Sequence, residues 1–434
     1  MSKAVVVNRQ SLFLRPDSSR VVVRPFKPAT EPRDLNPTDK TRANLIVDRV
    51  LALEPQAADL LLADVLENFE GRHRNLLATF EARAKEMEEA FAPHTVFSPT
   101  QRQLIGAYFL NEYSFEASAL FNPSIVAHPD QSGVPEGSRR FVLSLRAVGE
   151  GHVSSLTFRT GVIAPDGGVE IEPTARLAST PTIQTPLSGS PDESVELSFS
   201  ADQHISERVI FPVTPAQSNG IEDARFVEFE TEENEEKTFY ATYTAYSGKA
   251  IRSELLQTSD FISFKMTPLT GTAAMNKGMA LFPRKIDGRY AMIGRQDNEN
   301  LYLIYSDDLH EWNGGQAILR PKFPWEFVQM GNCGSPIELD EGWLLLTHGV
   351  GPVRRYAIGA ALLDKKDPSK VLARSRDPLV RPEKSEREGY VPNVVYTCGG
   401  MRHGELIILP YAVCDTVSNF STIRISELLQ TLDG

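Results

Sequence analysis

The chain has 434 residues, of which 41% are hydrophobic and 24% charged, and its formal net charge is −12. This composition is that of a globular protein and excludes wholesale disorder. General nucleic-acid binding requires a basic surface that displaces counterions from phosphates, so we expect no nucleic-acid partner. A few convergent Arg and Lys side chains can still hold a small anionic substrate inside an acidic protein.

The N-terminal twenty residues lack the continuous apolar stretch of a secretory signal, and no segment has the length of a membrane-spanning apolar helix. The three cysteines, Cys333, Cys398 and Cys414, form no close pair. An odd, sparse set of cysteines is typical of a reducing compartment. We therefore expect a cytoplasmic protein without a membrane partner.

From about residue 38 to residue 110, the apolar residues recur with the period of amphipathic helices. They follow the i, i+3, i+4, i+7 rule between Ala58 and Phe69, and a similar pattern runs from Leu76 to Phe91. Ser98, followed by Pro99 and Gln101, has the form of a helix-capping box. We predict four helices here that serve packing, or homo-oligomer contacts, rather than catalysis.

After Phe121 the sequence changes to short β-rich runs separated by Gly, Asp and Asn, with no periodic helical segments between them. Such runs include RRFVLSLRAV, TFYATYTAY, RYAMIGR, LYLIYS, GWLLLTHGV and GELIILPYAV. This pattern disfavours a doubly wound α/β sheet. Asp260 and Asp307 stand in similar turns after two such runs and lie 47 residues apart (307 minus 260). That spacing is the length of a four-stranded propeller blade.

We therefore predict an all-β fold, a five-bladed β-propeller with an N-terminal helical extension. Residues 1–115 would form an N-terminal β-arm and the helical extension, and residues 116–434 the catalytic propeller. The polar stretch 173–203 would be an insertion between the first two blades.

Several familiar site patterns are missing from the sequence. The eight histidines form no HxH or HExxH pair, so a histidine-based metal site lacks support. No phosphate-binding glycine loop and no G-x-S-x-G elbow is present. We expect neither a metal nor a nucleotide.

The segment Asn219–Phe226 instead places Glu222, Asp223 and Arg225 among apolar neighbours. Buried carboxylates are costly unless paired. If one carboxylate is bonded to Arg and its neighbour is desolvated, the pKa of the first falls and that of the second rises. Acid catalysis requires such a separation of pKa values. A structural ion pair would produce the same pattern. In an extended strand, the side chains of Glu222 and Asp223 would point to opposite faces.

A basic set comes from four other places in the sequence: Lys277, Arg295, His348 and the pair Arg354 and Arg355. Each by itself reads as a surface or packing residue. Together they would form an oxyanion or phosphate site at the mouth of a channel, because Arg suits bidentate oxyanion contacts.

From about Phe121 to the C-terminus, the chain resembles glycoside hydrolase family 130, the β-mannoside phosphorylases and related β-mannosidases. The resemblance rests on ordered motifs: FNPSIV, LSLRAVGEGHVSSLTFRTG, GIEDARF, NKGMALFPRKIDGRYAMIGRQ, LYLIYSDDLHEW, GSPIELDEGWLLLTHGV, IGAALLDKKDPSKVL, GYVPNVVY and YAVCDT. It implies a five-bladed propeller, inversion at the anomeric carbon and no cofactor, with inorganic phosphate as co-substrate.

The same resemblance assigns roles to residues of the sugar site. Asp223 takes the position of the general acid, although Ala224 stands where the family usually has Pro. The remaining positions match, or neighbour, the mannose-binding residues of the family: Asn122, Arg146, Glu222, Arg225 and Asp415.

For phosphate, the resemblance points to Lys277, in place of the more usual Arg, and to Arg295. Gln329 stands where phosphorylases of the family commonly have a third basic residue, and this departure argues against phosphorolysis. His348, Arg354, Arg355 or Tyr356 would then supply the missing contact.

Three functions remain open at this stage. Lys277 and Arg295 favour inverting phosphorolysis of a β-mannoside to mannose 1-phosphate and a shortened sugar. A carboxylate opposite Asp223, with Glu338 as one candidate, would favour inverting hydrolysis, which needs a base beside the attacking water. A non-catalytic propeller that binds a glycan is the third alternative, and the Glu222–Asp223 pair argues against it.

Overall fold

The structure is a computed structural model that describes residues 6–29, 40–91, 96–184, 190, 192–230 and 237–433. The chain divides into two compact units. The larger unit contains Met1–Asp17, Phe115–Ala175 and Thr180–Gly434. The smaller unit contains Ser18–Ser114 and Arg176–Ser179.

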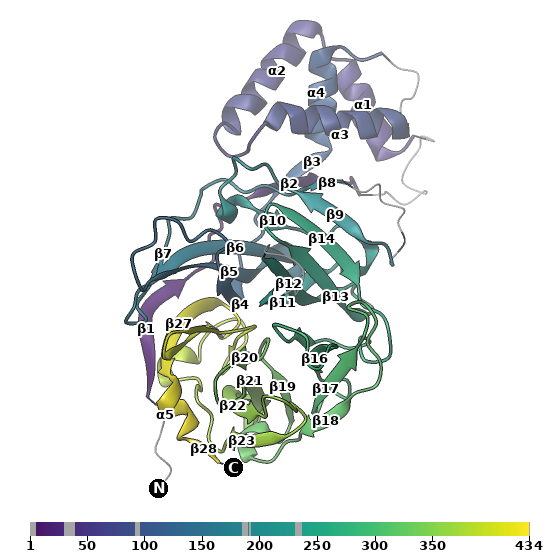
Figure 1. The fold of residues 1–434 in the computed structure, drawn as a ribbon. Helices are drawn as coiled ribbons and strands as arrows, with labels where there is room; N and C mark the ends of the chain where they lie inside the picture. Colours follow the sequence, from purple (N-terminus) through teal and green to yellow (C-terminus); the bar gives the residue numbers. More distant parts are fainter. Residues whose placement is uncertain are drawn as a thin grey trace. The chain divides into compact units, whose positions relative to one another are not determined.

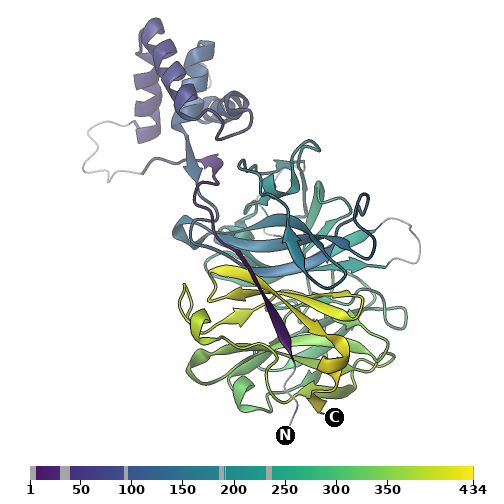
Figure 2. The same ribbon diagram turned by 90° about the vertical axis from the view of Figure 1, so that its left-hand side faces the viewer.

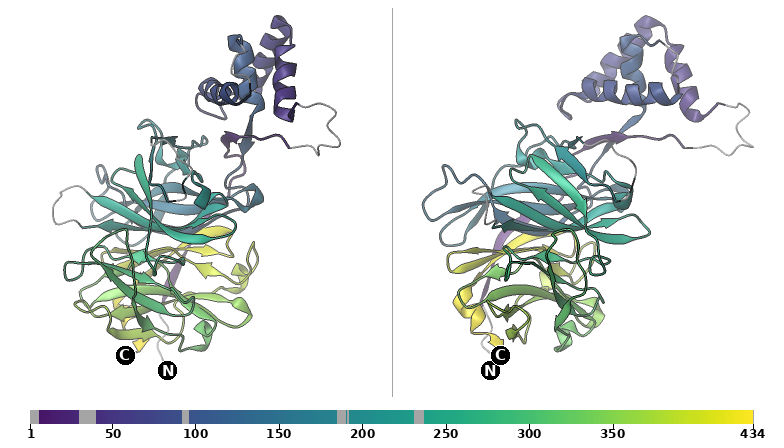
Figure 3. Two further views of the ribbon diagram at one scale, coloured as in Figure 1. Left: turned by 90° about the vertical axis from the view of Figure 1, so that its right-hand side faces the viewer. Right: turned by 45° about the vertical axis from the view of Figure 1, so that its right-hand side comes forward.

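The smaller unit is helical, as the sequence predicts. Its elements are β2 (Val22–Pro25), α1 (Arg42–Leu51), α2 (Pro55–Asn68), α3 (Leu76–Phe91), α4 (Pro99–Tyr108) and β3 (Leu110–Tyr113), and β2 pairs with β3 (Figure 3). The predicted capping box is present, because Ser98 Oγ accepts from Gln101 N at 3.2 Å and Gln101 Oε1 accepts from Ser98 N at 3.1 Å.

The core of this unit forms where α4 packs against α3. Leu104 and Ile105 are buried there with Val47 and Met87. A Cβ atom on Gly106 would lie 2.0 Å from the carbonyl oxygen of Phe80, so only glycine permits this close approach.

The larger unit is built mostly of antiparallel strands in groups that follow one another along the chain (Figure 1). The first group contains β4 (Ala119–Ala127), β5 (Arg139–Val148), β6 (Ser154–Ile163), β7 (Val169–Ile171) and β10 (Val209–Ile210). The second contains β11 (Gly220–Phe229), β12 (Thr238–Tyr246), β13 (Ile251–Thr258), β14 (Ser263–Pro268), β9 (Val195–Ser198) and β8 (Thr182–Ile183). A single parallel pairing of Gly220 with Ser154 joins these two groups into one eleven-stranded sheet.

The remaining groups are separate sheets. One contains β15 (Ala280–Leu281), β16 (Tyr290–Gly294), β17 (Leu301–Ser306) and β18 (Gln316–Leu319). The next contains β19 (Gln329–Asn332), β20 (Ile337–Glu338), β21 (Trp343–Val350), β22 (Tyr356–Leu363), β23 (Val371–Ser375) and β28 (Leu432–Asp433). The last contains β24 (Val395–Tyr396), β25 (Met401–His403), β26 (Leu406–Val413), β27 (Val417–Arg424) and β1 (Val7–Leu14), and α5 (Ile425–Leu429) follows β27.

Separate buried clusters lie between consecutive strand groups. Phe158 and Phe226 belong to the cluster between the first and second groups, and Met292 to the next one. A further cluster joins the last group to the first, where Phe121 packs near Ala412 of β26. The groups therefore form a closed ring held by apolar burial between sheets.

Backbone hydrogen bonds also close this ring, because Leu120 N donates to Thr416 O at 2.9 Å and Cys398 N to Pro123 O at 2.8 Å. The N-terminal strand β1 pairs with β27 and runs along the last sheet (Figure 2). The β-arm therefore groups with the larger unit and not with the helices, because its backbone completes the edge of that sheet.

The predicted strand runs agree with β5, β12, β16, β17, β21 and β26. The turns that contain Asp260 and Asp307 follow β13 and β17, at equivalent places in two sheets. The described part of the stretch 173–203, which the sequence predicts to be an insertion between the first two blades, contains β8 and β9, and these strands extend the edge of β14. The acidic run after Glu230 lies outside the described residues. Within the described ranges, no helix is long and apolar enough to cross a membrane.

Candidate active site

Asp223 on β11 lies at the centre of a polar cluster from three strands. Asn122 Nδ2, on β4, donates to Asp223 Oδ1 at 2.7 Å. Arg146, on β5, places Nη1 3.3 Å from Asp223 Oδ1 and Nη2 2.8 Å from Glu222 Oε1. Arg146 is itself held by Ser154 Oγ, which accepts from its Nε at 2.9 Å. One guanidinium therefore holds both carboxylates of the sequence motif.

The backbone at this cluster is left-handed at two of its residues. Asn122 has φ +49° and Asp223 has φ +55°. The register of β4 breaks between Phe121 and Ser124, and that of β11 breaks between Glu222 and Arg225. Such bulges re-aim side chains. The expectation that Glu222 and Asp223 face opposite sides is therefore wrong, because the bulge interrupts the alternation of the strand and both carboxylates reach Arg146.

The charge of Asp223 is stabilised by its cationic surroundings. Burial raises its pKa, but the positive charges of Arg146, Arg225 and Lys277 outweigh that effect and hold the pKa at about 2. The carboxyl group is thus ionised across the physiological pH range.

Asp415 has the opposite behaviour. It follows β26 with φ +49° and is half-buried. Burial, and then the negative charge of Asp223, raise its pKa to about 6, and the positive charges of Arg146 and Arg354 oppose that rise. Asp223 and Asp415 are therefore two carboxyl groups of this site whose pKa values lie far apart.

Arg225 is fully buried and holds the backbone of the cluster instead of a carboxylate. Its Nη1 donates to the carbonyl oxygen of Asp223 at 2.9 Å, and its Nη2 donates to the hydroxyl of Tyr396 at 2.8 Å. Tyr396 comes from β24, the strand group that closes the ring. The arginine thereby fixes the left-handed turn that presents Asp223.

The predicted basic residues Lys277 and Arg295 lie together. Arg295 Nε lies 3.3 Å from the carbonyl oxygen of Lys277, and Arg295 Nη1 lies 3.4 Å from His348 Nε2. A Cβ on Gly278, which has φ +93°, would lie 2.7 Å from Arg295 Nε, so glycine is needed for this approach. The charge of Lys277 also reaches Asp223, which connects the basic residues to the acidic cluster.

His348 is buried between two tyrosines. Its ring stacks on Tyr356 at 5.9 Å between centroids and meets Tyr396 edge-on at 4.9 Å. Burial, followed by the charges of Arg295 and Arg225, lowers the pKa of His348 well below its usual value. The imidazole is therefore neutral, and it contributes hydrogen bonding rather than positive charge.

Arg354 and Arg355 separate in the structure. The guanidinium of Arg354 lies 5.8 Å from the ring centroid of Tyr356, and its charge reaches Asp415. Arg355 instead lines a pocket together with Arg381 and Arg387. Among the described residues, no group of three or more His, Cys, Asp or Glu side chains is placed to hold a metal ion.

Comparison with known proteins supports the resemblance seen in the sequence. The family model for glycoside hydrolase family 130, described as beta-1,4-mannooligosaccharide phosphorylase, matches residues 199–434. The chain belongs to glycoside hydrolase family 130.

Two family 130 relatives are about one-third identical to this chain. A 1,2-β-oligomannan phosphorylase of Thermoanaerobacter sp. is 33% identical over 220 residues, which cover 50% of this chain and 72% of the relative. A β-1,2-mannobiose phosphorylase of Listeria innocua is 32% identical over 232 residues, which cover 52% of this chain and 63% of the relative. A solved structure of β-1,2-mannobiose phosphorylase from Listeria innocua matches with a TM-score of 0.53 and 22% identity, over 73% of this chain and 92% of that one.

Glu338, the candidate base for hydrolysis, is engaged elsewhere. Arg284 donates to its two oxygens at 2.9 and 3.0 Å, and Lys365 Nζ lies 3.4 Å from Oε1. These cations lower the pKa of Glu338, the hydrogen bond from Arg284 having the largest effect. Both carboxylate oxygens of Glu338 are therefore engaged by Arg284 and Lys365, neither of which is a candidate site residue.

Sequence reasoning missed two residues that organise the site, Tyr396 and Ser154. Both stand in the motifs that carry the family resemblance, GYVPNVVY and LSLRAVGEGHVSSLTFRTG. Their partners, Arg225 and Arg146, are 171 and 8 residues away along the chain. Each of them is a polar residue inside an otherwise apolar run, and this feature of the sequence could have identified them.

Proposed function

We propose that this family 130 chain catalyses inverting phosphorolysis of β-mannosides, releasing mannose 1-phosphate and a shortened sugar. The observation that carries the proposal is the meeting of an acidic cluster around Asp223 with a basic group around Lys277 and Arg295. The charge of Lys277 acts directly on Asp223. A phosphorylase needs this combination, because phosphate is itself the nucleophile and only an acid has to be supplied by the protein.

We also propose that the larger unit is a five-bladed propeller. Its strand groups are five when the second is counted separately from the first, to which one residue pair joins it. The apolar cluster between β26 and the β4–β5 hairpin supports a closed ring. The left-handed residues Asn122, Asp223 and Asp415 then come from three of the five blades.

In the proposed reaction, Asp223 donates a proton to the glycosidic oxygen as the bond from that oxygen to C1 breaks. A phosphate oxygen forms the new bond to C1 from the opposite face, so the configuration inverts. Asp223 must be protonated for this step, although the cations around it hold its pKa at about 2. A bound phosphate anion offsets the charge of Lys277 and Arg295, and it thereby raises the pKa of Asp223 toward the range in which the carboxyl group carries a proton.

The remaining residues divide between the two substrates. Lys277 and Arg295 would bind phosphate, assisted by His348, Tyr356 and Arg354. This set supplies cationic and hydrogen-bonding contacts although Gln329 stands at the third basic position.

The mannose ring would contact the residues around the acid: Asn122, Arg146, Glu222 and Asp415. Arg225 would act on Asp223 through the backbone. No cofactor is needed, since phosphate supplies the nucleophile.

The test is incubation of the protein with β-1,2- and β-1,4-linked mannobiose, with and without inorganic phosphate, and analysis of the products. We expect mannose 1-phosphate only when phosphate is present, formed as the α-anomer. Release of free mannose at the same rate without phosphate would identify a hydrolase. Binding of the sugars without turnover in either condition would identify a glycan-binding protein.

A further inference from the structure

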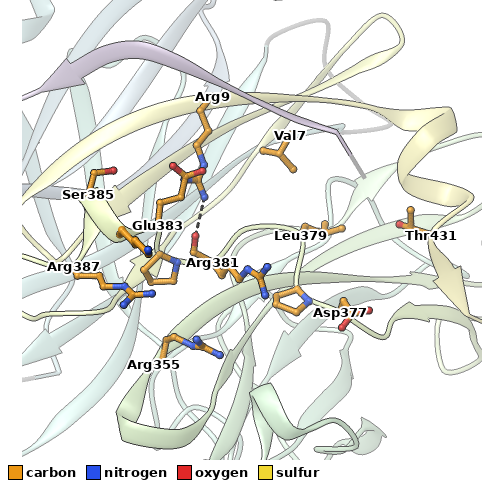
Figure 4. Close-up of a pocket in the computed structure, with 13 residues that line it drawn as sticks. Val7, Arg9, Arg355, Asp377, Leu379, Arg381, Glu383, Ser385, Arg387 and Thr431 are labelled. Carbon is orange, nitrogen blue, oxygen red and sulfur yellow. Dashed lines mark hydrogen bonds and ion pairs between the residues drawn. The ribbon is translucent and has the colours of Figure 1, made fainter. Parts of the chain in front are cut away.

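A second basic pocket lies in the larger unit, and its lining shares no residue with the cluster around Asp223. It has a volume of about 1020 Å³ and is shown in Figure 4. Its lining comes from β1, from the residue that precedes β22, and from the segment between β23 and β24. The lining residues used below are Arg9, Arg355, Arg381, Glu383, Lys384 and Arg387.

The pocket is strongly cationic although the chain is acidic. It is lined by five basic side chains and by two acidic ones, Asp377 and Glu383. Arg9 is already paired, since its Nη1 lies 2.5 Å from Glu383 Oε1 and 2.8 Å from Glu386 Oε2. Its Nη2 donates to the carbonyl oxygen of Arg381 at 2.8 Å. Arg9 therefore holds the segment between β23 and β24 in place. The other basic side chains of the lining are left to bind a ligand.

No hydrogen bond or ion pair joins the side chains of Arg355, Arg381 and Arg387 to any residue that the structure describes. All three are exposed, and Figure 4 shows them around the same pocket. Unpaired surface arginines are common singly. Three that line one pocket, with Lys384 beside them, offer the fork-shaped donors that bind phosphoryl oxygens bidentately.

The segment between β23 and β24, which carries Arg381 and Arg387, is anchored at several points. Leu379 N donates to Ile358 O at 2.8 Å, and Pro378 and Pro382 restrict its backbone. Glu386 Oε1 accepts from the Tyr411 hydroxyl at 3.0 Å inside the protein. A site fixed in this way loses little conformational entropy when it binds a ligand.

We propose that this pocket binds a phosphorylated sugar at a site distinct from the catalytic centre. The arginines supply the contacts to the phosphoryl group. The volume exceeds what one phosphate fills and suits a small organic ligand. The lining also offers the hydroxyls of Ser385 and Thr431 for a sugar body. A phosphoryl group alone and one carried on a sugar share the same recognition chemistry, and the test separates them.

The test is isothermal titration calorimetry of the full chain with mannose 1-phosphate and, separately, with inorganic phosphate. The double variant Arg381→Ala/Arg387→Ala should weaken one binding event for mannose 1-phosphate by about tenfold or more, because it removes two charge-assisted contacts. The matched control is Arg320→Ala, an exposed arginine outside this lining. Arg295→Ala should remove a different binding event, the one at the proposed catalytic phosphate site.

Phosphorolysis by the double variant at saturating phosphate should stay within about twofold of the unaltered chain, since the altered side chains are exposed and outside the Asp223 cluster. This measurement distinguishes an error in the proposal about the pocket from an error in the proposed function. Superimposable titrations of the unaltered chain and the double variant would overturn the proposal. An equal loss in Arg320→Ala would also overturn it. Binding of inorganic phosphate as tight as that of mannose 1-phosphate would overturn the assignment of a sugar body.

Discussion

Replacement of Asp223 by Asn keeps the shape of the side chain but removes both its charge and its transferable proton. The pKa of Asp223 falls from 3.8 to about 2 in the folded protein. At about 1.4 kcal/mol per pKa unit, the ionised carboxylate contributes on the order of 2 kcal/mol to stability at neutral pH. We expect Asp223→Asn to lose about that amount in urea unfolding at pH 7, because Arg146, Arg225 and Lys277 keep their charges without it.

The pH dependence of this loss has a definite sign. Because the folded pKa is depressed, the contribution of Asp223 is fully present above pH 3.8 and disappears as the pH falls toward 2. The stability difference between the unaltered chain and Asp223→Asn should therefore be largest near pH 5 and should shrink below pH 4. It should also decline as the pH rises through 6, because Asp415 then ionises beside the charge of Asp223 in the unaltered chain only. A variant as stable as the unaltered chain at pH 7 would refute the electrostatic account of the site.

The same substitution tests the proposed chemistry. Loss of general acid help should lower kcat on a natural mannobiose by about 10²–10⁴ while sugar binding persists. The loss should be smaller on an aryl mannoside whose leaving group needs little protonation. Glu222→Gln is the matched control, because Glu222 shares Arg146 with Asp223, and it should retain more activity. Near-normal turnover of mannobiose by Asp223→Asn would rule out its role as the proton donor.

Three further predictions follow from the same geometry. Arg295→Ala should raise the KM for phosphate at least about tenfold with little change in sugar affinity, because it removes a charge-assisted contact to phosphate. Initial-rate kinetics that show equal effects on both substrates would contradict this assignment. Asp415→Asn should stabilise the protein by about 3 kcal/mol at pH 8, because the pKa of Asp415 rises by about 2.2 units (6 minus 3.8) at about 1.4 kcal/mol per unit, and it should have little effect near pH 3. The reason is that a folded pKa raised to about 6 makes Asp415 cost stability as pH rises from 3.8 to 6, and unfolding curves at both pH values check this sign. Glu338→Gln should leave kcat within about twofold, because Glu338 is held by Arg284 and Lys365 outside the candidate site. A loss of mannoside cleavage that occurs only with water as the acceptor would point to hydrolysis.

Much of the architecture could be predicted from local patterns. The alternation and β-branched content of runs such as TFYATYTAY define β12, and the helical period with the Ser98 capping box defines α4. Asp223, Lys277 and Arg295 could also be identified, because a polar residue in an apolar run is costly unless it has a partner or a task. These inferences depend only on neighbours along the chain.

The directions of the side chains were decided by the tertiary structure. Glu222 and Asp223 both face Arg146, since a left-handed residue at position 223 interrupts the strand alternation. Arg225 finds its partner Tyr396 in a strand 171 residues away, and no local pattern encodes that pairing.

The tertiary structure also decided the place of two candidate residues. Arg355 lines the second basic pocket, and Glu338 forms an ion pair with Arg284. The sequence by itself determined which residues are chemically capable, because composition and spacing are local properties. Only the closed ring of sheets decided which of them meet, because that depends on contacts between strands that are distant along the chain.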